Sequence, residues 1–201
     1  SVKHPPTKLP EPPPPPKPTL VDDDFETTIV GAAPDGAVVN GEQGTASIRV
    51  TDELAAGGRR SLKVTDMTGL EPAWQPHLFY QPHFTEGALK QSFDLFLRPG
   101  ALLFTEWRDN TGYPNCIGPS VTFDARGGDA QVSASGRALG SVPCGEWVHV
   151  EIACPLGKAA PKAYSVTLTV PGRAPVAVTD LSFAGSDFRE VHWLGFVSTA
   201  T

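Results

Sequence analysis

Residues 147–153 read WVHVEIA and residues 163–170 read AYSVTLTV, and these two stretches decide the fold class. In the first, Val148, Val150 and Ile152 alternate with polar or aromatic residues, so the three share one face of an extended strand. The second stretch alternates in the same way. Alternation of apolar and polar residues over this length is typical of a strand with one buried face. Both stretches therefore predict strands of an antiparallel sheet that covers a core.

Short runs of the same kind recur from Phe25 to the C-terminal end, separated by turn residues. They are FETTIV, ASIRV, SLKVT, HLFY, LKQSFDLFL, ALLFTEW, SVTFD, AQVSA, VAVTDLSF and VHWLGFV. Glycine, proline and aspartate between the runs supply the corners of hairpin turns. About a dozen strands at this spacing indicate an all-β sandwich of two sheets. Only residues 52–56 could form a helical turn.

The first 20 residues differ from the rest because they contain the tract HPPTKLPEPPPPPKPTL, residues 4–20. Proline fixes φ and lacks an amide proton, so this tract is expected to form an extended polyproline II rod. We predict a linker over residues 1–20, one domain over residues 21–201, and a covalently linked domain upstream of the linker. A ligand for an SH3 or WW domain is the alternative interpretation of the tract.

The net charge and the apolar content of the chain limit the classes of partner that we expect. The net charge is −6, and the first 20 residues carry three lysines and one glutamate, so the remainder carries −8. Nucleic-acid binding requires clustered lysine and arginine to neutralise phosphates. No stretch approaches the roughly 20 apolar residues of a membrane span. We therefore expect neither nucleic acid nor membrane insertion.

The three cysteines do not have the spacing of a zinc finger. Cys144 and Cys154 flank one predicted strand, which would place them about 30 Å apart, too far for a disulfide. If hairpins alternate along the chain, Cys116 and Cys154 reach the same edge of a sheet. A Cys116–Cys154 disulfide is the preferred pairing, and three free thiols are the alternative.

The densest group of polar and aromatic residues lies at residues 104–116. Tryptophan and tyrosine rings can stack on a sugar, and charged or amide side chains can bind vicinal hydroxyls. Alternation places Glu106 and Arg108 on one side of the strand, with Trp107 and Asp109 on the other. A second aromatic patch at residues 74–84 could line the rim of a cleft, although its prolines equally suggest a rigid crossover loop packed on the sheet edge. The predicted ligand-binding residues are Trp107, Arg108, Asp109 and Tyr113, followed by Glu106, Trp74 and Tyr80. The alternative is a tryptophan that caps the core beside a surface pair of Arg108 and Asp109.

Catalysis has weaker support in the sequence. His149 and Glu151 share one face of their strand and could act as acid and base. The sequence contains no GxSxG, HExxH, GxxxxGK[ST] or GxGxxG motif. It also lacks the ExDxE-type strand that would hold paired carboxylates in a retaining glycosidase on such a sandwich. A non-catalytic protein is therefore favoured. His149 and Glu151 remain weak catalytic candidates.

The acidic run at residues 22–26 could supply oxygen ligands for Ca²⁺. The DxDxDG loop pattern is absent, and an acidic run is usually just solvated. No cofactor is required by any other pattern in the chain.

The order of DDFE, GRRSLKVTD, FTEWRDNTGYP, IGPSVTFDARG, GEWVHVEIACPLG and WLGFVSTA resembles a known family over residues 22–201. It is similar to the concanavalin A-like and laminin G-like jelly-roll modules attached to large secreted bacterial proteins, many of which degrade polysaccharides. The resemblance implies an antiparallel jelly-roll sandwich with carbohydrate binding as its leading function. In some such modules an acidic residue beside the first strand binds structural calcium, and Asp24 or Glu26 stands at the matching position.

These expectations combine into one hypothesis with two alternatives. The chain is expected to be an extracellular accessory module that binds a polysaccharide and is joined to another domain. The first alternative is an architectural sandwich without a ligand, which predicts that Trp107 and Trp74 are buried. The second is a lyase or glycoside hydrolase that uses Glu106, Arg108, His149 and Glu151 on one concave sheet.

Overall fold

The computed structural model describes residues 10–111 and 116–200, and within these ranges the chain is all-β with no helix. The strands are β1 (Val38–Asn40), β2 (Ser47–Thr51), β3 (Ser61–Thr65), β4 (His77–Tyr80), β5 (Gly87–Phe96), β6 (Leu102–Asp109), β7 (Cys116–Asp124), β8 (Ala130–Ala134), β9 (Arg137–Val142), β10 (Trp147–Leu156), β11 (Ala163–Thr169), β12 (Val176–Ser182) and β13 (Trp193–Ser198). Residues 52–56 form no helical turn.

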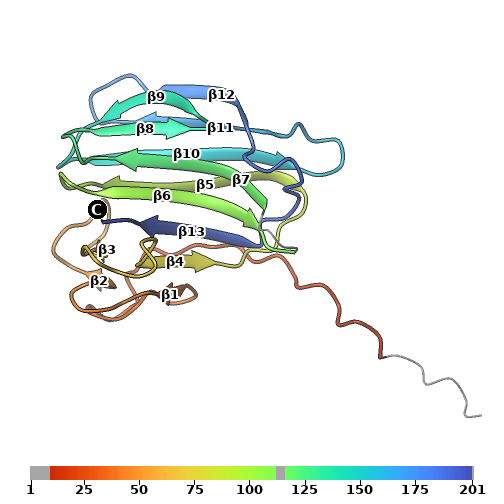
Figure 1. The fold of residues 1–201 in the computed structure, drawn as a ribbon, viewed down its shortest axis with the longest axis horizontal. Helices are drawn as coiled ribbons and strands as arrows, with labels where there is room; N and C mark the ends of the chain where they lie inside the picture. Colours follow the sequence, from red (N-terminus) through yellow and green to blue (C-terminus); the bar gives the residue numbers. More distant parts are fainter. Residues whose placement is uncertain (1–9, 112–115, 201) are drawn as a thin grey trace, which may run out of the picture.

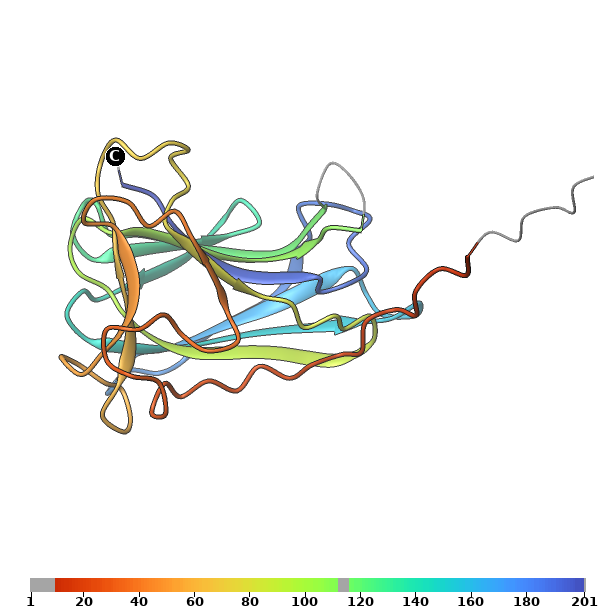
Figure 2. The same cartoon turned by 90° about the horizontal axis from the view of Figure 1, so that it is seen from below.

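The strands form two large layers. A seven-stranded sheet has the order β1-β4-β13-β6-β7-β8-β9, and a four-stranded sheet has the order β12-β11-β10-β5. Figure 1 looks onto the seven-stranded sheet, with the four-stranded sheet behind it. Figure 2 shows the two layers from the side, and the hairpin of β2 and β3 standing beside them at one end. The predicted two-sheet sandwich is confirmed.

The connections follow the jelly-roll pattern. The chain crosses between the sheets from β4 to β5, back to β6, from β9 to β10, and from β12 to β13. The last crossing places β13 between β4 and β6, and all pairings are antiparallel. Segments far apart in the sequence therefore meet in the middle of the seven-stranded sheet.

The core lies between the inner faces of the two sheets. Val148, Val150 and Ile152 of β10 are all at most 2% exposed, as their alternation predicts. They belong to the same buried cluster as Val121 and Phe123 of β7. A smaller cluster of Ile48, Leu78 and Tyr80 lies where the β2–β3 hairpin meets the seven-stranded sheet. Burial of these apolar side chains is the main stabilising term for the sandwich.

A chain of buried hydrogen bonds joins the two sheets through the core. The indole nitrogen of Trp107 donates to Gln91 Oε1 at 2.6 Å, and Gln91 Nε2 donates to Thr105 Oγ1 at 3.1 Å. The Thr105 hydroxyl in turn donates to the carbonyl oxygen of Gly195 at 2.8 Å. Every polar atom in this chain has a partner, which buried polar groups require. The chain fixes β5 against β6 and β13.

Residues 10–20 are exposed and form no strand. Figure 1 shows the proline-rich segment leading away from the sandwich. It meets the body where the backbone N–H of Thr19 donates to the carbonyl oxygen of Pro82 at 2.8 Å. No helix in the described residues is long and apolar enough to cross a membrane.

The predicted Cys116–Cys154 disulfide is not present, because Cys116, Cys144 and Cys154 are all free. Cys154 lies on the inner face of β10 and is fully buried, and burial raises the pKa of its thiol to about 12. The Cys116 thiol packs instead against Gly185, where a Cβ would come within 2.3 Å of its sulfur. The two sulfurs are therefore used in separate packing contacts, as the alternative of three free thiols requires.

Candidate functional site

The alternation of β6 separates the residues that the sequence predicts as one site. Trp107 lies on the inner face and is 1% exposed, while Glu106 and Arg108 lie on the outer face. A buried indole that donates to Gln91 cannot stack on a sugar. The prediction that Trp107 binds ligand is therefore wrong, and the alternative of a tryptophan capping the core is confirmed. The surface Arg108–Asp109 pair of that alternative is wrong, because Arg108 pairs with Glu106 and Asp109 is buried.

Asp109 also lies on the inner face and has a structural role. Its Oδ1 accepts from the backbone N–H and the hydroxyl of Thr111, and its Oδ2 accepts from the backbone N–H of Arg189 at 3.0 Å. Burial raises the pKa of Asp109, but these hydrogen bonds outweigh it and hold the pKa below its ordinary value. Asp109 therefore remains a carboxylate that ties the end of β6 to the segment before β13. It is not placed for ligand binding.

The remaining aromatic candidates do not join Arg108. Tyr80 is 9% exposed on the inner side, where its hydroxyl donates to Asp23 at 3.1 Å, and burial raises its pKa. Trp74 is 58% exposed in the loop before β4. Tyr113 lies outside the described residues. Of the predicted ligand-binding set, the structure places Glu106 and Arg108 together.

Glu106 and Arg108 form a partly buried ion pair in the middle of the seven-stranded sheet. Arg108 Nε donates to Glu106 Oε2 at 2.7 Å, and the side chains are 25% and 12% exposed. Ser120 of the neighbouring strand β7 donates to the other oxygen of Glu106 at 3.5 Å. Within the described ranges, no acceptor meets the terminal nitrogens of Arg108. The terminal N–H groups of a guanidinium are donors that suit a hydroxyl or a carboxylate.

Trp193 of β13 supports this pair from below. The guanidinium carbon of Arg108 lies 4.0 Å from the centroid of the Trp193 ring, within the range of a cation–π interaction. The indole lies flat because residue 195 is glycine: a Cβ there would come within 2.3 Å of the Trp193 ring. Phe79 of β4 stacks beside Trp193 at a centroid distance of 5.4 Å. Arg108 is thereby held over an aromatic floor.

His77 of β4 completes the aromatic side of this surface. Its Nδ1 lies 2.9 Å from Gln75 Oε1, and its Nε2 lies 3.4 Å from Asn40 Nδ2. An amide oxygen at Nδ1 and an amide N–H at Nε2 fit the neutral ring protonated at Nδ1. Burial and then the charge of Arg108 lower the pKa of His77, although a backbone hydrogen bond with Trp74 raises it. Nε2 is thus an acceptor near neutral pH.

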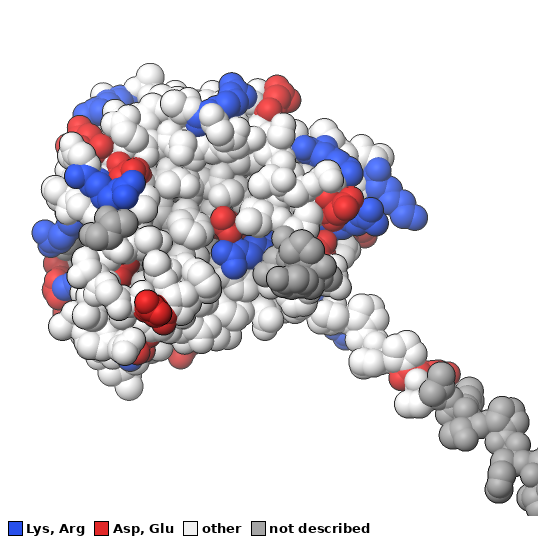
Figure 3. Space-filling model, in the orientation of Figure 1, with Lys and Arg blue, Asp and Glu red and all other residues white. Residues whose placement is uncertain are grey.

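The rest of this outer face is polar and carries few charges. The register places Ser120 and Thr122 of β7 beside Glu106 and Phe104, and Gln131 and Ser133 of β8 beyond them. Figure 3 looks onto this face: charged side chains gather mainly toward its edges, and a basic and an acidic group stand together near its middle. In Figure 2, the loop before β4 and the segment before β13 rise above opposite ends of the sheet. We call this surface, centred on Glu106, Arg108, Trp193, Phe79 and His77, the Arg108 face.

His149 and Glu151 lie on the opposite side of the molecule. They are on the outer face of the four-stranded sheet, where His149 Nδ1 is 2.8 Å from Asp94 and its Nε2 is 3.7 Å from Glu151. All three side chains are about a third to a half exposed. The sandwich separates them from Glu106 and Arg108, so the predicted catalytic group on one sheet is wrong. The two pairs cannot act on the same bond.

Asp24 and Glu26 are engaged with nearby backbone. Glu26 Oε1 accepts from the backbone N–H groups of Arg59 and Arg60 at 2.8 Å each, and Asp24 Oδ1 accepts from the N–H of Glu26. The hydrogen bonds from the backbone of Arg59 and then Arg60 are the largest causes that lower the pKa of Glu26. In the described ranges neither residue belongs to a group of three possible metal ligands. Calcium binding at Asp24 and Glu26 stays a prediction.

The predicted ligand-binding set did not include Trp193, Phe79 or His77, although the aromatic patch at residues 74–84 contains the last two. The signal was present in WLGFV, where a glycine two residues after a tryptophan leaves room for a flat ring on the same face of the strand. What the sequence did not reveal is that β13 lies next to β6, because the connection from β12 crosses between the sheets.

Comparisons with known proteins add little beyond the fold. No protein-family model and no curated protein matches the sequence. The fold is similar to the crystal structure of an endo-β-1,4-glucuronan lyase from the fungus Trichoderma reesei, with a TM-score of 0.49 and 12% identity. The similarity covers 88% of this chain and 82% of the lyase chain. At this level no residue and no activity of the lyase is transferred to this chain.

Proposed function

We propose that this domain binds a hydroxyl-rich polysaccharide on the Arg108 face, as an accessory module of a secreted multidomain protein. The observation that carries the proposal is the Glu106–Arg108 pair, held over Trp193 with the terminal nitrogens of Arg108 directed to no described partner. A guanidinium and a carboxylate fixed side by side offer donors and acceptors to vicinal hydroxyls. The fixed geometry reduces the entropic cost of binding.

The surroundings of the pair favour a ligand with little charge. Hydroxyl and amide side chains on β7 and β8 extend the hydrogen-bonding surface away from Arg108. Phe79 and His77 are half-buried and give apolar ring area on the other side. Glu106 neutralises Arg108, so the centre of the face carries no net charge. A neutral glycan chain lying across β4, β13, β6 and β7 fits this combination best.

The test is affinity electrophoresis of the full chain against a panel of neutral and acidic polysaccharides. Arg108→Ala is expected to weaken binding about tenfold or more, because a hydrogen bond from a charged group contributes roughly 1.5–3 kcal/mol. Arg108→Lys should restore part of the affinity, since it keeps the charge but loses the planar fork. His149→Ala, on the opposite sheet, is the matched control. No retardation by any polysaccharide, or equal retardation of wild type and Arg108→Ala, would contradict the proposal.

A lyase on the same face is the second candidate, and His77 is the observation that favours it. Its lowered pKa and the acceptor at Nε2 are the properties of a general base near neutral pH. Arg108 could stabilise the negative charge that develops when a proton is removed next to a carboxylate. Ultraviolet absorbance of unsaturated products from polyuronates would reveal this activity, and it should vanish in His77→Gln. An unchanged spectrum at high protein concentration would leave the binding module as the function.

A further inference from the structure

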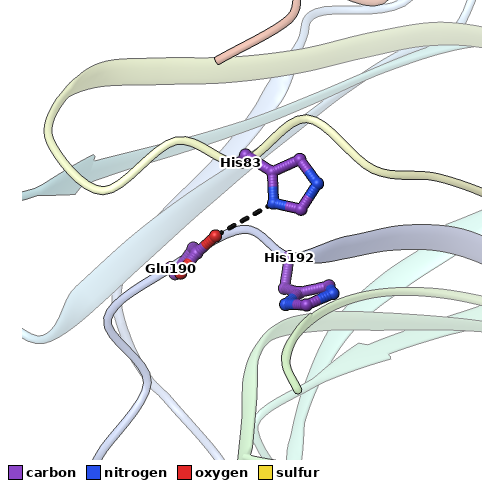
Figure 4. Close-up of side chains that lie close together, drawn as sticks. All are labelled: His83, Glu190 and His192. Atoms are coloured by element: carbon purple, nitrogen blue, oxygen red, sulfur yellow. Dashed lines mark hydrogen bonds and ion pairs between the residues drawn. The ribbon is translucent and has the colours of Figure 1, made fainter. Parts of the chain in front are cut away.

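A second cluster of side chains, none of which belongs to the Arg108–Trp193 stack, has the chemistry of a metal site. His83 follows β4, and Glu190 and His192 precede β13; Figure 4 shows the three side chains converging. One possible ligand atom from each lies within 4.8 Å of the other two. His83 Nδ1 is 3.1 Å from Glu190 Oε1, and the two imidazole rings have centroids 5.0 Å apart. It is the one such group of three among the described residues.

The fold gathers these residues through an irregularity in strand pairing. Tyr80 pairs with Leu194, whereas Phe84 pairs with Val191, so one extra residue is accommodated on the side of β4. His83 lies within this bulge with φ +60°, a left-handed conformation that a non-glycine residue adopts at a cost. Bulges re-aim side chains and are frequent next to functional sites. Here the bulge directs His83 toward the segment that enters β13.

An unsatisfied buried atom provides independent support for a ligand. His192 Nδ1 is buried, and no described residue hydrogen-bonds to it. A buried polar atom without a partner costs roughly 1–3 kcal/mol, so native proteins rarely leave one. We therefore assign Nδ1 as the ligand atom of His192, because a bound cation would satisfy it. Glu190 and His83 are 18% and 16% exposed, so the cluster is partly shielded but open to an entering ion.

The backbone around the cluster is held in place by neighbours. The Asp109 carboxylate accepts from the N–H of Arg189, immediately before Glu190. The N–H of His83 donates to the carbonyl oxygen of Val191 at 2.8 Å, and the N–H of His192 donates to the carbonyl oxygen of Arg108 at 3.1 Å. These bonds fix both segments that carry the ligands. Outer interactions of this kind orient the ligands of metal sites.

From this geometry we propose that His83, Glu190 and His192 bind a borderline transition-metal cation such as Zn²⁺. Two imidazoles and one carboxylate form a ligand set that suits zinc, whereas Ca²⁺ and Mg²⁺ prefer oxygen ligands alone. Tetrahedral zinc with bonds near 2.0–2.1 Å places its ligand atoms about 3.3 Å apart. The His83–Glu190 distance of 3.1 Å is already close to this value, and the third ligand atom would have to move by at most about 1.5 Å. Three protein ligands leave one position for water.

Zinc at this site would join the bulge after β4 to the entry of β13. Pro82, which accepts the hydrogen bond from Thr19, directly precedes His83. The ion would therefore strengthen the end of the sandwich at which the proline-rich segment leaves. This role is independent of whether the Arg108 face binds a glycan.

The test uses the full chain freed of metal by chelation and then titrated with Zn²⁺, Ca²⁺ or Mg²⁺. Zinc should bind at one ion per chain and raise the melting temperature, whereas calcium and magnesium should have no effect at the same concentration. Replacing Zn²⁺ by Co²⁺ should give weak d–d absorption without a thiolate charge-transfer band, which distinguishes this site from Cys116 or Cys144.

Variants assign the ligands. His83→Ala and His192→Ala should each lower Zn²⁺ affinity by about 100-fold or more, because the loss of a direct ligand should cost at least as much as the loss of an outer-shell partner. Glu190→Gln keeps the side-chain volume and should also weaken binding. His149→Ala is the matched control, because it removes an imidazole from another histidine–carboxylate cluster and should leave affinity unchanged. Absence of a zinc-induced shift in the folded wild type, a thiolate band with Co²⁺, or full affinity in the His83 and His192 variants would overturn the proposal.

Discussion

The outer faces of the two sheets each carry a carboxylate paired with a basic side chain at a similar distance, in very different surroundings. Glu106 and Arg108 are 2.7 Å apart and 12–25% exposed, whereas Asp94 and His149 are 2.8 Å apart and 41–49% exposed. The first pair lies over the Trp193 ring in the middle of seven strands. The second lies on β5 and β10 at one edge of four strands. Similar residue types and similar distances therefore produce a preorganised pair on one face and a solvated pair on the other.

The surroundings of a charged pair therefore decide whether it can take part in recognition. An exposed pair is screened by water and contributes about 0–1 kcal/mol. A partly buried pair on an aromatic support keeps its geometry when a ligand arrives, which makes it a better candidate for recognition.

The largest effect is expected from Trp107→Ala, which removes the inner support of β6 beneath the Arg108 face. Deleting a buried tryptophan should lower the free energy of unfolding by about 3–5 kcal/mol. The change also leaves Gln91 Oε1 without its donor. Trp74→Ala, at an exposed position, should change it by less than about 0.5 kcal/mol. Urea denaturation of both variants measures the difference, and equal losses would show that Trp107 does not support the core.

The second-largest loss of stability is expected from Gly195→Ala, which places a methyl group against the Trp193 ring. The new Cβ would meet the Trp193 ring at 2.3 Å and the carbonyl oxygen of Leu78 at 2.6 Å. Because a backbone oxygen cannot move freely, we expect a loss of about 1–3 kcal/mol in the free energy of unfolding. Gly127→Ala is the matched control, since nothing lies within 4 Å of the added atom. A thermal melt in which the two variants behave alike would contradict the flat placement of the indole.

A smaller effect is expected in the coupling free energies of the two pairs, which should differ between the faces. Double-mutant cycles with Glu106→Gln and Arg108→Gln should give a coupling free energy of about 1–2 kcal/mol. The cycle with Asp94→Asn and His149→Gln should give less than about 0.5 kcal/mol. Both are measured from urea midpoints at low salt, and added salt should reduce the second coupling more. Equal couplings on the two faces would remove the distinction between them.

The smallest effect concerns the pH dependence of stability at His77. Its pKa is lowered in the folded protein, so between that value and the ordinary value near 6.5 the unfolded chain binds a proton that the native protein does not. The contribution of His77 to the free energy of unfolding should therefore be fully present above about pH 6.5 and should be lost as the pH falls through this window. His77→Gln should show a weaker fall between about pH 7.5 and about pH 5 in urea titrations. An identical pH dependence in both proteins would contradict the lowered pKa.

The sequence predicted the strands well because alternation is a local property. It assigned Val148, Val150 and Ile152 to the core, and it placed Glu106 and Arg108 opposite Trp107 and Asp109 on β6. It could not decide which side of β6 faced the core, because both sides carry an aromatic or a polar side chain.

The sequence did not predict which strands are neighbours in the sheets. That order depends on where the chain crosses between the two sheets, which no local pattern records. Nothing in the sequence near Arg108 indicates that Trp193, 85 positions later, pairs directly opposite it. The same limit applies to His83 and His192, which meet because β13 enters beside β4. The predicted catalytic group placed His149 and Glu106 on one sheet. They lie on different sheets, because the assignment of β6 and β10 to sheets depends on long-range pairing that no local pattern records.

The close fit between Trp193 and Gly195 has a consequence for how this protein can vary over evolution. A side chain at position 195 and a flat indole at position 193 exclude each other, because they would occupy the same space. The two positions are therefore expected to covary in descendants of a common ancestor. A lineage that gains alanine or serine at 195 should lose the large ring at 193, and with it the selective pressure that keeps arginine at 108.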